Sequence, residues 1–221
     1  MRRRDFLSTA AAAAALLPAA ALANTLAPSP ETASPQAFAA GAHAMPLGLV
    51  IAPSDNPEET IRRVHELGLP TCFLSLDAYI GKFTPQLADQ FKGLLAKYSV
   101  TCTTVEVVGP PPLVWDFMQG PSTIGVVPRA TRAARIDALK QASDFAKLLG
   151  VHQVQTHCGF IPENPADPLY KETVAAIREV AEHCAKNDQR FLMETGQETP
   201  TTMSRALRDV KMPNLGVGLD T

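Results

Sequence analysis

The sequence predicts an α/β fold of the (β/α)8 TIM-barrel type, in which helices cover a parallel sheet. Six short segments, rich in β-branched or aromatic residues and mostly apolar on both faces, alternate with amphipathic stretches. The first of these segments leads into "APSDNPEET", which contains no glycine-rich phosphate-binding loop. An open doubly wound sheet usually carries such a loop after its first strand, so the barrel is the favoured alternative.

The composition indicates one globular domain, because 46% of the 221 residues are apolar and 19% are charged. Residues 1–23 combine a basic start, an Ala/Leu stretch and a small-residue cleavage pattern, which predicts an export signal. Arg3-Arg4 resembles the twin-arginine type, so the expected location is the periplasm. The apolar stretch is too short to span a bilayer, and no membrane span is expected in the mature form. Residues 24–45 suit a flexible linker, and the domain covers residues 46–221.

The net charge indicates which partners to expect, and the cysteines indicate whether disulfides form. Without residues 1–23 the chain keeps 17 basic and 21 acidic residues, a net charge of −4, which argues against nucleic acid as a partner. The four cysteines form no CxxC pair and lie mostly in apolar runs. We expect buried thiols, with a disulfide as the alternative that an oxidising compartment permits.

The six predicted strands are 47–53, 71–77, 101–109, 152–160, 190–196 and 215–220. Five helices lie between them, and four begin with a capping side chain followed by proline at the first helical position. These pairs are Asn56-Pro57, Thr84-Pro85, Asp167-Pro168 and Thr199-Pro200. Gly68 and Gly150 are predicted to end two of the helices in the left-handed conformation.

Helical spacing of apolar residues predicts which helix faces meet the sheet. One such face comprises Leu87, Phe91, Leu94, Leu95 and Tyr98, and another comprises Tyr170, Val174, Ile177, Ala181 and Cys184. Strands alternating with such helices call for a parallel sheet with right-handed crossovers.

Five successive predicted strands carry a titratable residue at or near their carboxyl ends. In a barrel these ends share one rim, where the chemistry takes place. Each residue alone has an ordinary alternative, as a helix cap or a core histidine, but their recurrence at one rim favours a site. Carboxylates and an imidazole suit Mn, Mg, Co or Zn, which would polarise a carbonyl while a neighbouring carboxylate carries a proton. The residues are Asp77, Glu106, His157, Glu194 and Asp220.

Several longer motifs resemble those of the xylose isomerase-like TIM-barrel superfamily of sugar phosphate isomerases and epimerases, and in particular its exported twin-arginine members. The resemblance runs from about Pro46 to the end of the chain. It is densest in "GPSTIGVVPRATRAARIDALKQASDFAKLLGV", "THCGFIPENPADPLY", "FLMETGQETPTTMSRAL" and "NLGVGLDT".

The resemblance implies roles for individual residues. Glu194 would be a metal ligand and the catalytic acid/base of a proton transfer through an enediolate, and Asp220 would be a second metal ligand. His157 would have a catalytic and substrate-binding role, and Glu106 and Gln197 would bind substrate.

The resemblance also implies that the barrel is incomplete. A full barrel takes about 200 to 250 residues, whereas 176 residues run from Pro46 to Thr221, enough for six β/α units. We expect a C-terminally truncated enzyme that lacks two of the four metal ligands and one of the two proton-transfer glutamates that the resemblance implies. The alternative is a natural short form completed by self-association into a homo-oligomer.

The expected function is a metal-dependent isomerase or epimerase of a sugar, sugar phosphate or polyol. A dehydratase of inosose type would use the same groups. An abasic-site endonuclease of this superfamily is disfavoured by the charge and the export signal. A non-enzymatic periplasmic carbohydrate-binding protein would need aromatic residues, but these make up 6% of the chain, with Trp115 the only tryptophan. Trp115 lies in a long loop after the third predicted strand, either covering the rim or filling space beneath the loop.

Overall fold

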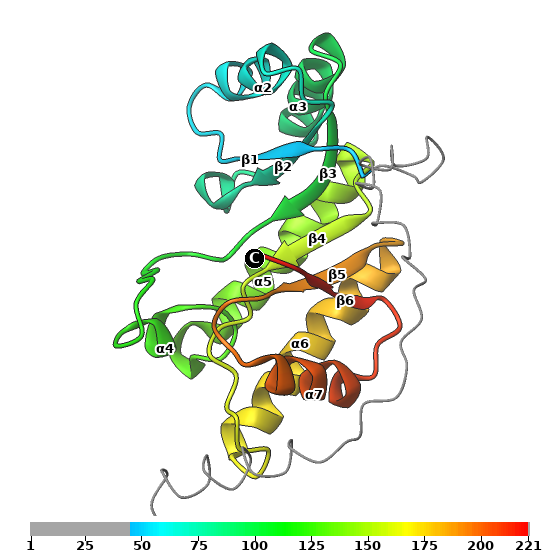
Figure 1. Ribbon diagram of the computed structural model, residues 1–221. Helices are drawn as coiled ribbons and strands as arrows, with labels where there is room; N and C mark the ends of the chain where they lie inside the picture. The colour runs from blue at the N-terminus through cyan, green and yellow to red at the C-terminus, as the bar shows by residue number, and fades with distance from the viewer. Residues whose placement is uncertain (1–44, 221) are drawn as a thin grey trace, which may run out of the picture. The chain divides into compact units, whose positions relative to one another are not determined.

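The computed structural model describes residues 45–220, and the predicted export signal and nearly all of the predicted linker lie outside them. Six strands alternate with helices in this part of the chain (Figure 1). The strands are β1 (Gly48–Ile51), β2 (Thr71–Ser75), β3 (Thr101–Glu106), β4 (Gln153–Thr156), β5 (Arg190–Glu194) and β6 (Leu215–Gly218). The helices are α2 (Pro57–Glu66), α3 (Pro85–Lys97), α4 (Gly120–Thr123), α5 (Arg129–Leu149), α6 (Pro168–Lys186) and α7 (Pro200–Val210), with a 3-10 turn at Asp77–Tyr79.

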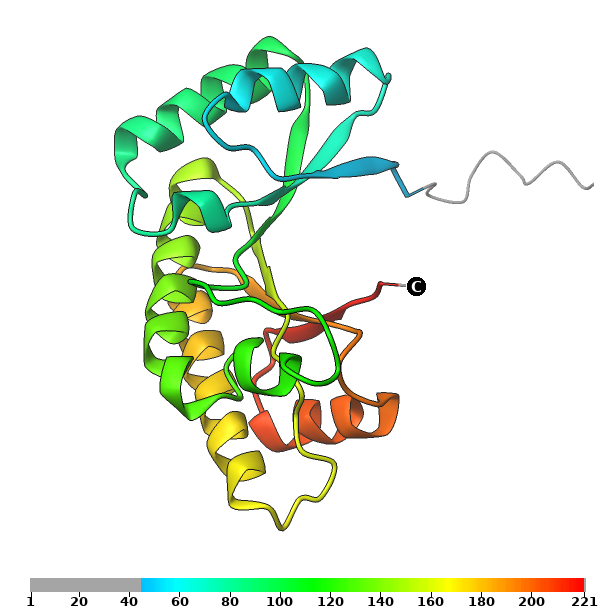
Figure 2. The same cartoon turned by 90° about the vertical axis from the view of Figure 1, so that its left-hand side faces the viewer.

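The sheet has the order β1-β2-β3-β4-β5-β6, and every neighbouring pair is parallel. Strand order therefore follows chain order without the reversal that defines a doubly wound sheet. Figure 2 shows the sheet curving, with the helices on its outer side. This confirms the predicted fold class, an incomplete barrel of the TIM type, for the described residues.

The predicted strands are confirmed in position but are shorter than expected at the rim. The third ends at Glu106 and the fourth at Thr156, and the residues that follow leave the ladder as loops. Gly109 and Gly159 take positive φ angles of 130° and 95°, which a strand does not accommodate. The apolar character of these segments continues past the strands because the loops beneath the rim are buried too.

The predicted helix starts are confirmed. Asn56, Thr84, Asp167 and Thr199 each accept a hydrogen bond from a backbone N–H of the first turn, and proline follows each one. The remaining predicted helix is α5, which begins at Arg129 after Pro128 and has no side-chain cap. Gly68 and Gly150 follow α2 and α5 with φ of 69° and 76°, as predicted.

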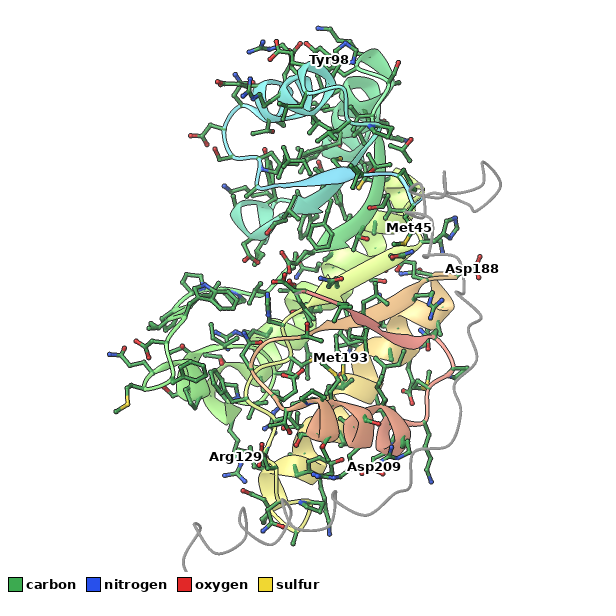
Figure 3. All side chains as sticks on the ribbon, in the orientation of Figure 1. Met45, Tyr98, Arg129, Asp188, Met193 and Asp209 are labelled. Carbon is green, nitrogen blue, oxygen red and sulfur yellow. The ribbon has the colours of Figure 1, made fainter. Side chains whose placement is uncertain are left out.

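The core lies between the sheet and the helices. The predicted face of α6 is fully buried, whereas on α3 Phe91 and Leu95 are buried and the other three residues are half-buried against the core. Met193 of β5 belongs to this covered side of the sheet (Figure 3). The cysteines are free thiols, and three of the four are buried while Cys102 is half-buried.

The opposite, concave face of the sheet is defined here by Phe73, Glu106, Gln155 and Glu194, which line a cavity of about 320 Å³. Within residues 45–220, β1 and β6 are the edge strands. Val50 and Leu219 at these edges are 66% and 77% exposed. None of the described helices is long and apolar enough to cross a membrane.

Candidate functional site

Three titratable side chains meet at the carboxyl ends of β3, β4 and β5. Glu106 is the last residue of β3, His157 follows β4 directly, and Glu194 is the last residue of β5. Because these strands are parallel neighbours, their ends share one edge of the sheet. One ligating atom from each residue lies within 4.8 Å of the other two. The structure therefore brings together three of the five residues predicted at the rim.

Hydrogen bonds fix the imidazole of His157 on both sides. Its Nε2 lies 3.0 Å from Oε2 of Glu194 and 4.0 Å from Oε1 of Glu106. Its Nδ1 lies 3.0 Å from Oε1 of Gln197. The indole of Trp115 meets the imidazole edge-on, with ring centroids 4.8 Å apart. His157 is thus the residue that links the two carboxylates to the loop side chains.

Gln155 is a site residue that the sequence analysis missed. Its amide nitrogen donates to Oε2 of Glu194 at 2.9 Å, and only 7% of the residue is exposed. A Cβ on Gly218 of the neighbouring β6 would lie 2.1 Å from Oε1 of Gln155. Glycine at position 218 therefore provides the space that this orientation of Gln155 requires. The sequence does offer one sign of this role. Gln155 precedes His157 by two residues in the same predicted strand, and residues two apart in a strand point to the same face of the sheet.

The pKa values of the two carboxyl groups in the cluster are shifted in opposite directions. Burial, and next the adjacent Glu194 carboxylate, raise the pKa of Glu106 to about 8. Burial of Glu194 works against its ionisation, but hydrogen bonds from His157, Glu106 and Gln155 lower its pKa to about 2. Near neutral pH, Glu106 therefore holds a proton while Glu194 is ionised.

Two further groups of the site have shifted pKa values, the imidazole of His157 and the carboxyl of Glu198. Burial disfavours the charged form of His157, but hydrogen bonding and charge attraction to Glu194 raise its pKa above the ordinary value. Burial raises the pKa of Glu198 to about 7. Neither carboxylate oxygen of Glu198 bonds to another residue of the described chain. The sequence suggests for Glu198 only a role in supporting the loop beside Gln197, because a glutamate in a loop gives no sign of burial.

The carboxylate of Asp77 binds the backbone of a loop rather than the side chains of the cluster. Its Oδ1 accepts hydrogen bonds from the backbone N–H groups of Val108 and Gly109, at 2.9 and 3.1 Å. The fully buried Arg135 donates to the carbonyls of Gly125 and Pro112, at 2.8 and 3.0 Å. Both side chains hold the loop between β3 and α4 that brings Trp115 to the site. Asp77 follows β2 at the same end of the sheet, but it is not one of the three groups whose ligating atoms lie within 4.8 Å of one another.

Comparison with known proteins agrees with this geometry. The sequence profile of the family described as "Xylose isomerase-like TIM barrel" matches residues 61–221. The chain belongs to this xylose isomerase-like family. No curated protein sequence matches it.

Solved structures of the xylose isomerase-like fold resemble the described residues. One is a xylose isomerase domain protein from Planctomyces limnophilus, with a TM-score of 0.72 and 27% identity over 79% of this chain and 63% of that one. Another is D-psicose 3-epimerase from Clostridium cellulolyticum H10 with D-tagatose, with a TM-score of 0.60 and 15% identity over 80% and 63%. A third is a xylose isomerase-like protein from Mycobacterium smegmatis in complex with magnesium, with a TM-score of 0.60 and 16% identity over 80% and 64%. The chain spans less than two thirds of the length of each.

Within this xylose isomerase-like chain, Asp220 lines the same cavity as the cluster but stands apart from it. Its backbone N–H and carbonyl bond to the hydroxyl of Thr195, at 3.0 and 2.9 Å. Its carboxylate is exposed and is not one of the three groups within 4.8 Å. Its assignment as a metal ligand remains a prediction.

The donor set of the cluster fits a divalent metal ion. Two carboxylates and one imidazole are the ligand types of catalytic centres that leave a position open for water or substrate. The spacing within 4.8 Å allows a single ion to contact all three groups. Geometry therefore favours Glu106 and His157 as partners of Glu194, where the resemblance had given them substrate-facing roles.

Proposed function

We propose that this protein is a metal-dependent sugar isomerase or epimerase that moves a proton at the carbon next to a carbonyl. The observation that carries the proposal is the cluster of Glu106, His157 and Glu194 at the carboxyl end of the sheet, in a chain of the xylose isomerase-like family. The D-psicose 3-epimerase similarity supports a sugar as substrate, and the magnesium complex supports a divalent ion.

The cluster would hold the ion, with Asp220 as a further ligand from the cavity wall. Such an ion polarises a carbonyl of the sugar and lowers the cost of removing the neighbouring proton. To bind a metal ion, a carboxylate must be ionised and an imidazole must be neutral. Glu194 meets the first condition because its pKa is about 2.

The acid/base work is assigned to the carboxylates of this chain. Glu194 takes the proton, and Gln155 keeps its carboxylate oriented through the 2.9 Å hydrogen bond. Glu106 carries a proton near neutral pH in the metal-free protein, because its pKa is about 8, and it would give up this proton on becoming a metal ligand. His157 lies 3.0 Å from Glu194 and would orient the substrate oxygen beside it.

The dimensions of the site suit a monosaccharide. A cavity of about 320 Å³ lies at the lower end of the range for small-molecule sites, about 300 to 1,000 Å³. Its walls combine titratable groups with the apolar side chains of Val50, Phe73 and Leu219. The half-exposed Trp115 offers a flat apolar surface beside His157 for the face of a sugar ring.

Proton abstraction is tested directly by deuterium exchange. The protein is incubated in D2O with Mn²⁺, Mg²⁺, Co²⁺ or Zn²⁺ and a panel of ketopentoses, ketohexoses and inososes, followed by NMR. We expect deuterium at the carbon next to the carbonyl, even where no product accumulates. Glu194→Gln should abolish the exchange, and Glu182→Gln, the same change at an exposed position of α6, should not.

The same experiment separates the alternatives. Loss of water from an inosose identifies the dehydratase. Binding of sugar by calorimetry with no exchange identifies a carbohydrate-binding protein. If neither binding nor exchange occurs with any metal, the proposal is overturned.

We also propose that residues 1–23 direct export to the periplasm by the twin-arginine route. The supporting feature is Arg3-Arg4 before an apolar Ala/Leu stretch. A variant with both arginines replaced by lysine keeps the charge but should stay in the cytoplasm, whereas the unaltered chain should reach the periplasmic fraction. Cytoplasmic retention of the unaltered chain would contradict the proposal.

A further inference from the structure

Two cysteines face each other across neighbouring strands at the end of the sheet opposite the site. Cys72 of β2 and Cys102 of β3 are direct partners in the parallel register, just before a bulge at Cys72/Phe73. Partnered residues project their side chains to the same face of a sheet. Neighbouring strands lie about 4.7 to 4.9 Å apart, and disulfides join Cα atoms about 4.4 to 6.8 Å apart. The backbone spacing therefore permits a bond between the two sulfurs.

The two thiols already interact. Hydrogen bonding to Cys102 lowers the pKa of the Cys72 thiol, and the same interaction together with burial raises the pKa of Cys102. The Cys102 thiol also donates to the carbonyl of Thr104 at 3.4 Å. Cys72 is 1% exposed whereas Cys102 is half-buried, so a reagent approaches the pair through Cys102.

The remaining cysteines lack this arrangement. Cys158 follows β4 and Cys184 lies within α6, and both are buried. Burial raises the pKa of each thiol, that of Cys184 to about 11. Neither has a cysteine as its partner in the sheet register. They provide internal controls for any chemistry that depends on the pairing.

We propose that Cys72 and Cys102 are a thiol pair that closes to a disulfide by exchange with a small-molecule disulfide of the glutathione type. Cys102, the more accessible thiol, loses its proton to solvent and attacks one sulfur of the external disulfide, which leaves a mixed disulfide on Cys102 and releases one thiol. Because the pKa of Cys102 is raised, this first step should be slow at neutral pH and faster at higher pH. Cys72 as thiolate then attacks the Cys102 sulfur and releases the second thiol. The two cysteines together lose two electrons and two protons, and the external disulfide is reduced to two thiols.

The bond would join β2 to β3 and enclose residues 72–102. A closed loop of this kind limits the freedom of the unfolded chain, so the oxidised protein should resist unfolding more than the reduced one. β3 also carries Glu106, four residues beyond Cys102, so the cross-link fixes the base of a strand that supplies the site. This inference does not depend on the proposed function.

The test is a count of free thiols in the folded full chain. The protein is incubated with oxidised or reduced glutathione, denatured, alkylated and measured by intact mass and peptide mapping. We expect two of the four thiols to escape alkylation after oxidation, with one cross-linked peptide pair containing Cys72 and Cys102. The urea midpoint of the oxidised protein should lie above that of the reduced protein.

Variants distinguish the pair from general thiol oxidation. Cys102→Ser, at the half-buried position, should abolish the cross-link and the rise in the urea midpoint, while Cys184→Ser should retain both. Cys72→Ala serves as a second test of the pair that leaves Cys102 in place. A stable glutathione adduct on Cys102 without the cross-link, four alkylated thiols, or a cross-link that includes Cys158 or Cys184 would overturn the proposal.

Discussion

On β5, Met193 is fully buried in the core beneath the helices, whereas the next residue, Glu194, faces the concave cavity and binds His157 and Gln155. The same contrast holds on β3, where Val105 is fully buried in the core and Glu106 lines the cavity. Successive side chains of a strand point to opposite faces of the sheet. The residues that stabilise the fold therefore lie on the covered face, and the residues of the candidate site lie on the concave face.

The two faces also differ in what burial does to their residues. On the covered face, burial of apolar side chains is favourable and non-directional. On the concave face it opposes ionisation, and specific hydrogen bonds decide which carboxylate carries the charge. The pKa values of about 8 for Glu106 and about 2 for Glu194 are the result. A substitution on one face should therefore affect a different property from one on the other.

The largest effect is expected from Glu194→Gln on the concave face. This change removes the acid/base group and a metal ligand while keeping the volume of the side chain. We expect the deuterium-exchange rate to fall by about 10² to 10⁴-fold, with a much smaller change in the urea midpoint. A variant that loses stability and activity together would contradict the separation of the two faces.

The neighbouring change, Met193→Ala, tests the covered face of the same strand. Removing a fully buried Met side chain leaves a cavity, and we expect a loss of about 2 to 5 kcal/mol in the free energy of unfolding. Metal affinity of the folded protein, measured by calorimetry, should stay the same. Met118→Ala is the matched control, because Met118 is 89% exposed and its loss should cost less than about 0.5 kcal/mol.

Gly218→Ala should affect the concave face without removing any group of the cluster. The added Cβ would lie 2.1 Å from Gln155 Oε1, so Gln155 must move and its bond to Glu194 is lost. We expect metal affinity to fall about 10 to 100-fold, the usual cost of losing a group that orients a ligand. Gly93→Ala is the control, since a Cβ there meets no atom within 4 Å and Gly93 lies within α3. Unchanged affinity in Gly218→Ala would show that Gln155 does not orient Glu194.

Metal binding should release a proton from Glu106. Its pKa of about 8 means that the carboxyl is protonated at pH 7, and a metal ligand must be ionised. We expect affinity to rise about fivefold from pH 7 to pH 8 and to level off above about pH 9, at about tenfold the value at pH 7. Calorimetry in two buffers of different ionisation enthalpy measures the proton released. In Glu106→Gln the proton release at this position should disappear.

A further effect on the concave face concerns stability against pH in the absence of metal. The folded protein holds the Glu106 proton more tightly than the unfolded chain, because its pKa is raised from 4.5 to about 8. This contribution is complete below about pH 4.5 and is lost as the pH rises through about 8. Glu106→Gln should therefore gain stability relative to the unaltered protein as the pH rises from about 4.5 to 8, measured by urea unfolding. An equal pH dependence in both proteins would show that Glu106 is not the responsible group.

The sequence predicts the covered side of the molecule well, because local rules determine it. The four capped helix starts and the apolar face of α6 depend on residues close together in the chain, and the structure confirms them. The order of the strands follows from the alternation of strands and helices once the missing phosphate-binding loop has favoured the barrel over the doubly wound sheet. The rim residues Glu106, His157 and Glu194 were found by the same logic, since parallel strands end at one edge.

The remaining features depend on contacts between strands. Gln155 looks like any polar residue in a strand until Gly218 is placed beside it. Asp77 has the right position at the end of a strand, but a loop that leaves the sheet early takes its hydrogen bonds. The partnership of Cys72 with Cys102 requires the register of β2 and β3, which a bulge shifts and which spacing alone does not give.

The agreement between strand order and chain order has a consequence for how the protein is made. Each strand pairs with the one synthesised just before it, so its partner is already in place when it leaves the ribosome. Such a sheet can grow by one β/α unit at a time, and no step has to pair strands that are distant in chain order. We expect the units from β1 onward to assemble during translation, before the last strand has been synthesised. A folded state reached this early would suit a protein that its predicted twin-arginine signal sends across a membrane already folded.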